Sequence, residues 1–189
     1  MPARKRSFVA VVKAAERALR AARVEHVFVG ALAVGAFGVP RTTADVDVIA
    51  DWRADQTIAI ARAFRRQGLR VSEGDLRDAL AQRSHCTVHD LRSEFHLDLA
   101  PAFRPAAKDS IRGLVRLRWR GVTLPVASPE HTIVMKLVFG SEQDLEDALG
   151  IYVRQKGRLD VRRLRDFARR QGATGALRDL ERRAADEGR

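Results

Sequence analysis

Residues 44–50, with the sequence ADVDVIA, constrain the fold more strongly than any other part of the chain. Polar and apolar side chains alternate strictly there, and in a β-strand the side chains of residues i and i+2 point to the same face. Asp45 and Asp47 therefore share one face, while Val46 and Val48 point to the other. The segment predicts a strand with one face in a hydrophobic core and two carboxylates on the opposite face.

The segments around this strand predict a mixture of strands and helices up to residue 126. Apolar residues at helical spacing predict helices over 8–23, 31–37 and 54–67. Short apolar or alternating runs predict strands over 26–30, 85–91 and 93–100, and then a hairpin over 111–126 that turns near Arg120 and Gly121. The polar stretch 69–83 receives no assignment, and Pro101 and Pro105 interrupt the pattern before the hairpin.

The last third of the chain predicts helices alone. They are expected over 129–139, 141–155, 160–171 and 174–187. We therefore predict an α+β fold, in which a small mixed β-sheet core flanked by helices (residues 1–126) precedes a helical C-terminal part (residues 127–189).

The composition is that of a packed domain outside the membrane. Hydrophobic residues make up 46% of the 189 residues, and no apolar run approaches the roughly 18–20 residues that a membrane span needs. Cys86 is the single cysteine, so no internal disulfide can form. A reducing compartment fits this cysteine content, and we expect the protein to be cytoplasmic.

The formal net charge of +11 is concentrated in the predicted core. Residues 1–129 contain 22 basic and 13 acidic residues, a net charge of +9, and residues 130–189 contain 13 and 11, a net charge of +2. Arginine dominates the basic residues and suits bidentate contacts to phosphate, although a GC-rich genome also produces an arginine excess. The core is therefore the part that we expect to face a polyanion.

Three aspartates and one glycine turn carry the predicted chemistry. Two carboxylates side by side repel each other, and a divalent cation relieves that repulsion. Asp98 lies on the polar face of the strand predicted over 93–100, so three carboxylates converge if that strand lies beside 44–50. Such a group suits Mg²⁺ (or Mn²⁺) and phosphoryl or nucleotidyl transfer. At Gly30 a strand ends and a helix begins, where backbone N–H groups can bind phosphate.

The segment from Gly30 onward resembles the signature of the DNA polymerase β-like nucleotidyltransferase superfamily. The matching residues are Gly30-Ala31, Arg41, Thr43, Asp45, Asp47 and, on a later strand, Asp98. The stretch MKLVFGSEQDLEDALGIY resembles the Lys-then-Asp-Leu-x-Asp segment of bacterial AbiEii-like and related toxin nucleotidyltransferases. It supplies Lys136, Asp144 and Asp147.

The resemblance implies transfer of a nucleoside monophosphate from an NTP to an acceptor hydroxyl, with release of pyrophosphate. It makes Asp45, Asp47 and Asp98 the catalytic, metal-binding residues. The residues that it implies for nucleotide binding are Gly30, Ala31, Arg41, Thr43, Lys136, Asp144 and Asp147. Basicity and the toxin-like segment favour an RNA acceptor, such as the 3′ end of a tRNA. A cognate antitoxin is then an expected partner, and a membrane is not.

Two departures from the pattern keep other interpretations open. Ala31 offers no hydroxyl to a phosphate, and residues 141–143 replace a basic pair that often precedes the aspartate. A non-catalytic RNA-binding or regulatory protein on a degenerate fold is one alternative. A small aminoglycoside-like acceptor is another, and it predicts an acidic pocket. Lys136 can also extend to solvent, and Asp144 and Asp147 can form surface ion pairs.

Overall fold

The computed structural model describes residues 5–186. The chain forms two compact units. One unit contains the residues up to Val29 and Thr42–Val126, and the other contains Gly30–Arg41 and the residues from Ala127 onward. None of the described helices is long and apolar enough to cross a membrane.

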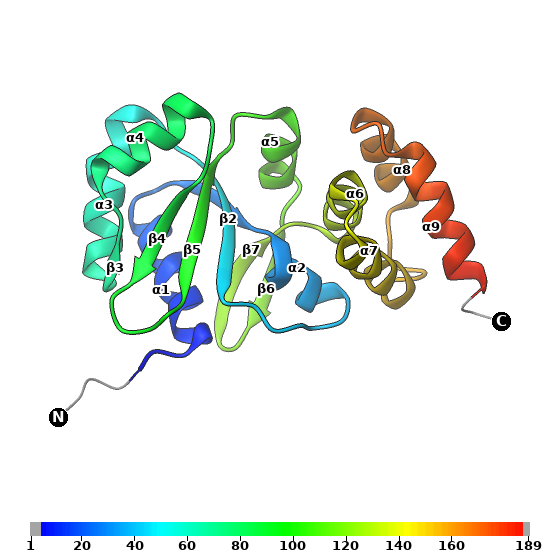
Figure 1. Cartoon of the computed structure of the whole chain (residues 1–189), viewed down its shortest axis with the longest axis horizontal. Coiled ribbons are helices and arrows are strands. Elements are labelled where there is room, and N and C mark those ends of the chain that lie inside the picture. Colours follow the sequence, from blue (N-terminus) through cyan, green and yellow to red (C-terminus); the bar gives the residue numbers. More distant parts are fainter. Residues whose placement is uncertain (1–4, 187–189) are drawn as a thin grey trace. The chain divides into compact units, whose positions relative to one another are not determined.

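The first unit is built on a seven-stranded mixed sheet in the order β3-β4-β5-β2-β1-β7-β6 (Figure 1). Its strands are β1 (Glu25–Phe28), β2 (Asp45–Asp51), β3 (Leu69–Arg70), β4 (Cys86–Asp90), β5 (His96–Pro101), β6 (Val115–Trp119) and β7 (Val122–Val126). Its helices are α1 (Phe8–Ala21), the 3-10 turn η1 (Ala54–Gln56), α3 (Thr57–Arg66), α4 (Glu73–Gln82) and α5 (Pro105–Arg112). The pairs β2–β5 and β1–β7 are parallel, and the other pairs are antiparallel.

The sheet of the first unit has one apolar and one polar face around β2. Val46 and Val48 are buried, and their partners on β5, Leu97 and Leu99, are fully buried. The residues between them point to the other face, as the alternating sequence predicts. We call this polar side, which carries Asp45, Asp47 and Asp98, the carboxylate face. The predicted α+β fold and the strand over 44–50 are therefore confirmed.

Two helices lie where the sequence pattern is weakest. Ser72 accepts a hydrogen bond from the backbone of Asp75, whose side chain bonds back to Ser72, and this capping box begins α4. Pro105 stands in the first turn of α5, where its missing N–H costs nothing. The hairpin turn at Arg120 and Gly121 is confirmed, because both residues have positive φ between β6 and β7.

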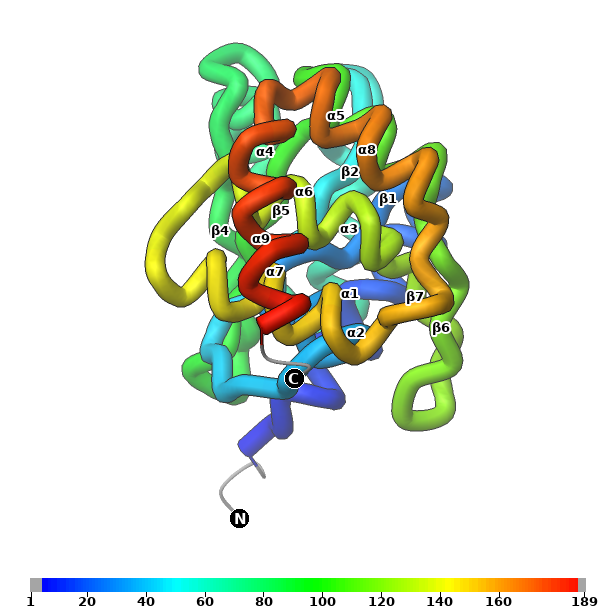
Figure 2. The backbone as a smooth tube through the Cα atoms, turned by 90° about the vertical axis from the view of Figure 1, so that its right-hand side faces the viewer, coloured from blue at the N-terminus to red at the C-terminus, as the bar shows by residue number. Residues whose placement is uncertain are grey.

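The second unit consists of helices. They are α2 (Gly30–Phe37), α6 (Pro129–Phe139), α7 (Glu142–Arg154), α8 (Val161–Arg170) and α9 (Thr174–Asp186). Helix α6 contacts α2, α7, α8 and α9, and Figure 2 shows its place among the last three. Gly38 follows α2 because a Cβ atom there would lie 2.7 Å from Cγ1 of Ile151. The segment after Gly30 thus packs with helices far along the chain.

Candidate metal-binding site

Three aspartate side chains converge on the carboxylate face of the first unit. Strands β2 and β5 are parallel neighbours, and their register places Asp47 directly beside Asp98. Asp45 precedes Asp47 by two residues, so its side chain leaves the same face. Carboxylate oxygens of all three residues lie within 4.8 Å of one another, and each residue is half-buried. The convergence that the sequence predicts is present in the structure.

Threonine hydroxyls orient two of these carboxylates. Thr87 lies opposite Asp98 on β4, and its Oγ1 donates a hydrogen bond of 3.2 Å to Oδ1 of Asp98. The hydroxyl of Thr43 donates to the carboxylate of Asp45. Each hydrogen bond holds its carboxylate in one orientation. The alternation in HCTVHDL places Thr87 on the polar face of its strand, but no local pattern pairs it with Asp98.

The donor set fits a divalent cation that prefers oxygen. Mg²⁺ and Mn²⁺ bind carboxylates together with substrate phosphates. Two such ions about 3.5–4 Å apart can share carboxylates at this separation. Among residues 5–186, one group of three or more Asp, Glu, His or Cys side chains is close enough together to hold a metal ion, and it consists of these three aspartates. A zinc site at His85, His89 and His96 therefore finds no support in the described structure.

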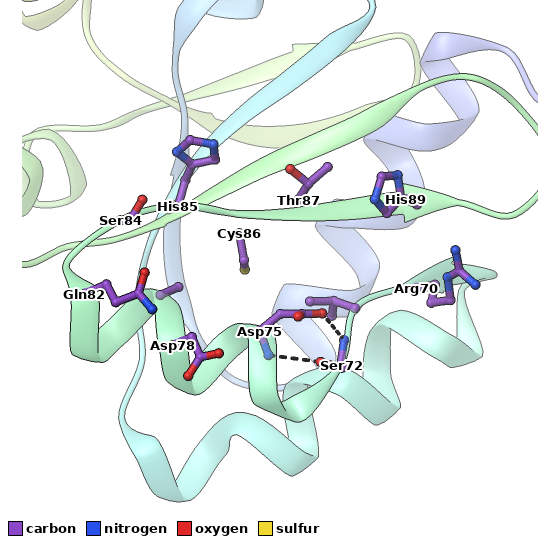
Figure 3. A pocket seen from close by; sticks show the side chains of 12 residues that line it. Arg70, Ser72, Asp75, Asp78, Gln82, Ser84, His85, Cys86, Thr87 and His89 are labelled. Carbon is purple, nitrogen blue, oxygen red and sulfur yellow. Dashed lines mark hydrogen bonds between the residues drawn. The ribbon is translucent and has the colours of Figure 1, made fainter.

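A polar groove of about 570 Å³ lies between α4 and β4 (Figure 3). Asp75, Asp78 and Gln82 of α4 line one side, and β4 lines the other, where Cys86 points toward α4 and the side chains of Thr87 and His89 point away from it. Thr87 belongs both to this groove and to the hydrogen bond with Asp98. The side chains of α4, however, face the side of β4 that carries Cys86, whereas Asp98 lies on the opposite face with Thr87.

The buried thiol in the wall of this groove is unreactive. Burial raises the pKa of Cys86 to about 12, and the negative charge of Asp75 acts in the same direction. A thiol with that pKa is protonated at neutral pH, and the thiolate is the nucleophilic form. The chemistry of the groove therefore rests on its carboxylate, imidazole, amide and hydroxyl groups.

A second cluster of aspartates lies in the helical unit, where the side chains of Lys136 and Arg41 form ion pairs with it. The Nζ atom of Lys136 lies 2.5 Å from Oδ1 of Asp144 and 2.9 Å from Oδ2 of Asp147. Arg41 Nε is 3.5 Å from Oδ2 of Asp147, and Ser141 Oγ donates to Asp144 at 2.6 Å. Lys136 is 8% exposed and Asp147 is 6% exposed. This network joins α6, α7 and the chain that follows α2.

Lys136 and Asp144 hold each other in the ionised state. Burial by itself lowers the pKa of Lys136, but hydrogen bonds to Asp144 and Asp147 outweigh it and raise the pKa overall. Burial likewise raises the pKa of Asp144, and the hydrogen bonds from Lys136 and Ser141 outweigh it and lower that pKa. Both shifts favour the charged forms. The nucleotide-binding role of Arg41, Lys136, Asp144 and Asp147 remains a prediction, whereas their mutual contacts are part of the structure.

The turn predicted to bind phosphate contains a glycine in the left-handed backbone conformation. Gly30 has a φ of 56°, in the left-handed region, and it begins α2. The next residue, Ala31, is buried at 7% exposure. Phosphate binding at these two residues and at Thr43 remains a prediction.

Comparison with known proteins identifies the fold. No protein-family model matches the sequence, and no curated protein matches it. The solution structure of the antibiotic-resistance factor ANT(2'')-Ia is similar to this chain, with a TM-score of 0.57, 15% sequence identity and 95% of each chain covered. The crystal structure of ANT(2'')-Ia in complex with adenylyl-2''-tobramycin has a TM-score of 0.58, 14% identity, and coverage of 86% of this chain and 97% of its own.

The chain shares the fold of ANT(2'')-Ia. The fold that the resemblance from Gly30 to Asp47 implies is therefore found in the structure. The closer resemblance to AbiEii-like toxins rests on the residues around Lys136 and stays a prediction. At identities of 15% and 14%, the similarity to known structures establishes the fold alone.

Proposed function

We propose that this protein is a metal-dependent nucleotidyltransferase that moves a nucleoside monophosphate from an NTP to an acceptor hydroxyl and releases pyrophosphate. The observation that carries the proposal is the convergence of Asp45, Asp47 and Asp98 within 4.8 Å on the carboxylate face. Three carboxylates at this spacing suit Mg²⁺ or Mn²⁺ and the phosphates of an NTP.

Each aspartate has a distinct role in the proposed reaction. Asp45, oriented by Thr43, and Asp47 would hold both metal ions, and Asp98, oriented by Thr87, would complete the second. When bound, the metal lowers the pKa of the acceptor hydroxyl and neutralises charge on the departing pyrophosphate. The acceptor oxygen forms a bond to the α-phosphorus, the bond from that phosphorus to the bridging oxygen breaks, and Asp98 accepts the hydroxyl proton.

RNA is the acceptor that we propose first, with the 3′ end of a tRNA as the specific form. The support is the net charge of +11, most of it in residues 1–129, because phosphate neutralisation by basic side chains drives RNA binding. The toxin-like segment around Lys136 adds a cognate antitoxin protein to the proposed partners. The substrate pair is then an NTP and an RNA hydroxyl.

A small acceptor that carries hydroxyl and amino groups is the second candidate. The groove between α4 and β4 supports it, because Asp75 and Asp78 line this groove. Carboxylates attract protonated amines and repel phosphates. In addition, one structure with the same fold holds adenylyl-2''-tobramycin. This candidate keeps the same metal site and changes the acceptor.

The deciding experiment offers both acceptors to the full-length protein. Each of the four NTPs, labelled at the α-phosphate, is incubated with Mg²⁺ and total RNA, and separately with a panel of aminoglycosides. We expect labelled RNA as the product, and a labelled aminoglycoside would favour the second candidate instead. The matched controls are Asp47→Asn protein and an excess of EDTA. If no NTP yields a labelled product or pyrophosphate with either acceptor, the catalytic proposal is wrong.

A further inference from the structure

Strand β6 presents a row of arginines at one edge of the sheet. It is the last strand in the sheet order, next to β7. Arg116 and Arg118 are both exposed, and so is Arg120 in the turn that follows. We call these three residues the arginine edge. Because residues i and i+2 of a strand are about 6.7 Å apart, the side chains of Arg116 and Arg118 form a spaced pair on one face.

The strand register shows which face carries this pair. Val126 is paired with Phe28, and Phe28 is paired with Val48, so all three side chains point to the apolar face. Pro125 precedes Val126 on β7, so its side chain points to the opposite face. Arg116 is the cross-strand partner of Pro125 and points to the same face as Pro125. The arginine pair thus shares the carboxylate face with the three aspartates.

The distance from the arginine edge to these aspartates is one that a short single strand of nucleic acid can span. In the sheet order β2-β1-β7-β6, three steps separate β2 from β6. At about 4.8 Å a step, this is roughly 14 Å across the strands, and the register adds about 7 Å along the strands for Arg116 and about 13 Å for Arg118. A few nucleotides of a single strand span that distance.

The charges of the arginine edge are available to an external anion. Among the described residues, Arg116, Arg118 and Arg120 make no ion pair, and the nearest pair along the chain joins Arg112 to Asp109. The planar guanidinium group binds phosphate through two parallel hydrogen bonds. We propose that the arginine edge binds the phosphodiester backbone of single-stranded RNA, whose 3′ hydroxyl reaches the aspartates. This inference rests on the proposed nucleotidyl transfer to RNA.

Charged residues on an edge strand have a second use, which the test must separate from RNA binding. They prevent the edge from pairing with another sheet and so keep a protein from aggregating. Glutamate serves that purpose as well as arginine does, but it repels phosphate. The double substitution Arg116→Glu/Arg118→Glu therefore keeps the protection of the edge and removes the proposed function.

The experiment measures binding of a fluorescent single-stranded RNA of about ten nucleotides to the full-length protein over a range of salt concentrations. We expect Arg116→Glu/Arg118→Glu to raise Kd by at least about tenfold at low salt. Each lost phosphate contact should reduce the slope of log K against log salt by about 0.7. The matched control is Arg65→Glu/Arg66→Glu, which makes the same change of charge at exposed positions of α3 in the same unit. We expect the control to weaken binding far less.

Equal losses of affinity in both double variants would overturn the proposal, because net charge rather than the arginine edge would then determine binding. Unchanged binding in the β6 variant would overturn it as well. Size-exclusion chromatography and thermal melts show whether this variant is folded and monomeric, and Arg116→Gln/Arg118→Gln replaces it if it is not. Transfer by the wild-type protein to a dinucleotide acceptor, too short to reach β6, tests the proposed function separately.

Discussion

Each unit of this protein holds a cluster of aspartates, and the two clusters differ in what their carboxylates contact. In the helical unit, Asp144 and Asp147 lie against Lys136, and Asp147 also faces Arg41. In the sheet unit, three aspartates lie within 4.8 Å of one another, and threonine hydroxyls orient two of them. One cluster is built around a cation of the protein, and the other brings like charges together.

This difference separates a structural carboxylate from a ligand-binding one. A buried carboxylate costs free energy unless a cation and hydrogen bonds compensate it. The network around Lys136 supplies that compensation internally, so we expect it to stabilise the helical unit. Like charges on neighbouring strands raise the free energy of the folded protein, and a divalent cation lowers it again. Substitutions in the two clusters should therefore affect different properties.

The largest expected effect is on catalysis, from Asp47→Asn in the sheet cluster. Loss of one metal-binding carboxylate removes several kcal/mol of transition-state stabilisation, so we expect transfer to fall by at least about 1,000-fold. In the wild type, Mg²⁺ with NTP at about 100 times its Kd should stabilise the fold by roughly 2.7 kcal/mol. The variant should lose this stabilisation, while its metal-free stability changes by less than about 1 kcal/mol. Thermal melts with and without Mg²⁺ and NTP measure both quantities. A variant that keeps the ligand-dependent rise in Tm would show that Asp47 does not bind the metal.

The next largest effect is on stability, from Lys136→Met in the helical cluster. Removal of the ammonium group leaves the buried Asp147 and the half-buried Asp144 without their closest cation, and breaking a buried pair in this way costs about 3–5 kcal/mol. Urea denaturation measures the free energy of unfolding. The same substitution at the exposed Lys156, at the end of α7, is the control and should cost less than about 1 kcal/mol. If Lys136→Met unfolds like the wild type but no longer binds NTP, its role is in nucleotide binding and not in the stability of the unit.

A smaller effect is expected from Thr87→Val on metal affinity. Valine keeps the shape and strand preference of threonine but cannot donate to Asp98, so the carboxylate loses its orientation. Loss of such an indirect contact weakens metal binding by about 10-fold to 100-fold, and electron paramagnetic resonance of Mn²⁺ measures the affinity. Thr123→Val, at an exposed position of β7, should leave Mn²⁺ binding unchanged. Equal affinities of the Thr87 variant and the wild type would contradict the orienting role.

The smallest expected effect is a dependence of stability on acidic pH. Hydrogen bonds from Lys136 and Ser141 outweigh burial and lower the pKa of Asp144 in the folded state. The stabilisation is therefore complete above the unfolded pKa, about 3.9, and is lost as the pH falls through the folded value. Melts between neutral pH and pH 2 should show a smaller acid-dependent fall in Tm for Asp144→Asn than for the wild type. Identical falls would mean that Asp144 is not coupled to folding.

The sequence contained more local signals for helices and strands than the predicted elements used. The alternation of ADVDVIA placed Asp45 and Asp47 on one face of a strand, and the glycine turn and the hairpin turn were also visible. The capping residues Ser72 and Asp75 and the helix-starting Pro105 stood in the sequence as well. They mark helices in segments that polar composition and prolines had left unassigned. Such features act within one turn of the backbone, so a few consecutive residues are enough to encode them.

Contacts between distant segments were decided by the tertiary structure. The carboxylate of Asp98 meets Asp47 only because β5 lies parallel to β2 in one register, and a shift of one residue would turn Asp98 to the apolar face. The contact of Lys136 with two aspartates and the shared face of Arg116 and the carboxylates arise in the same way. Strand order and register depend on how the whole chain buries its apolar surface. No window of neighbouring residues contains that information.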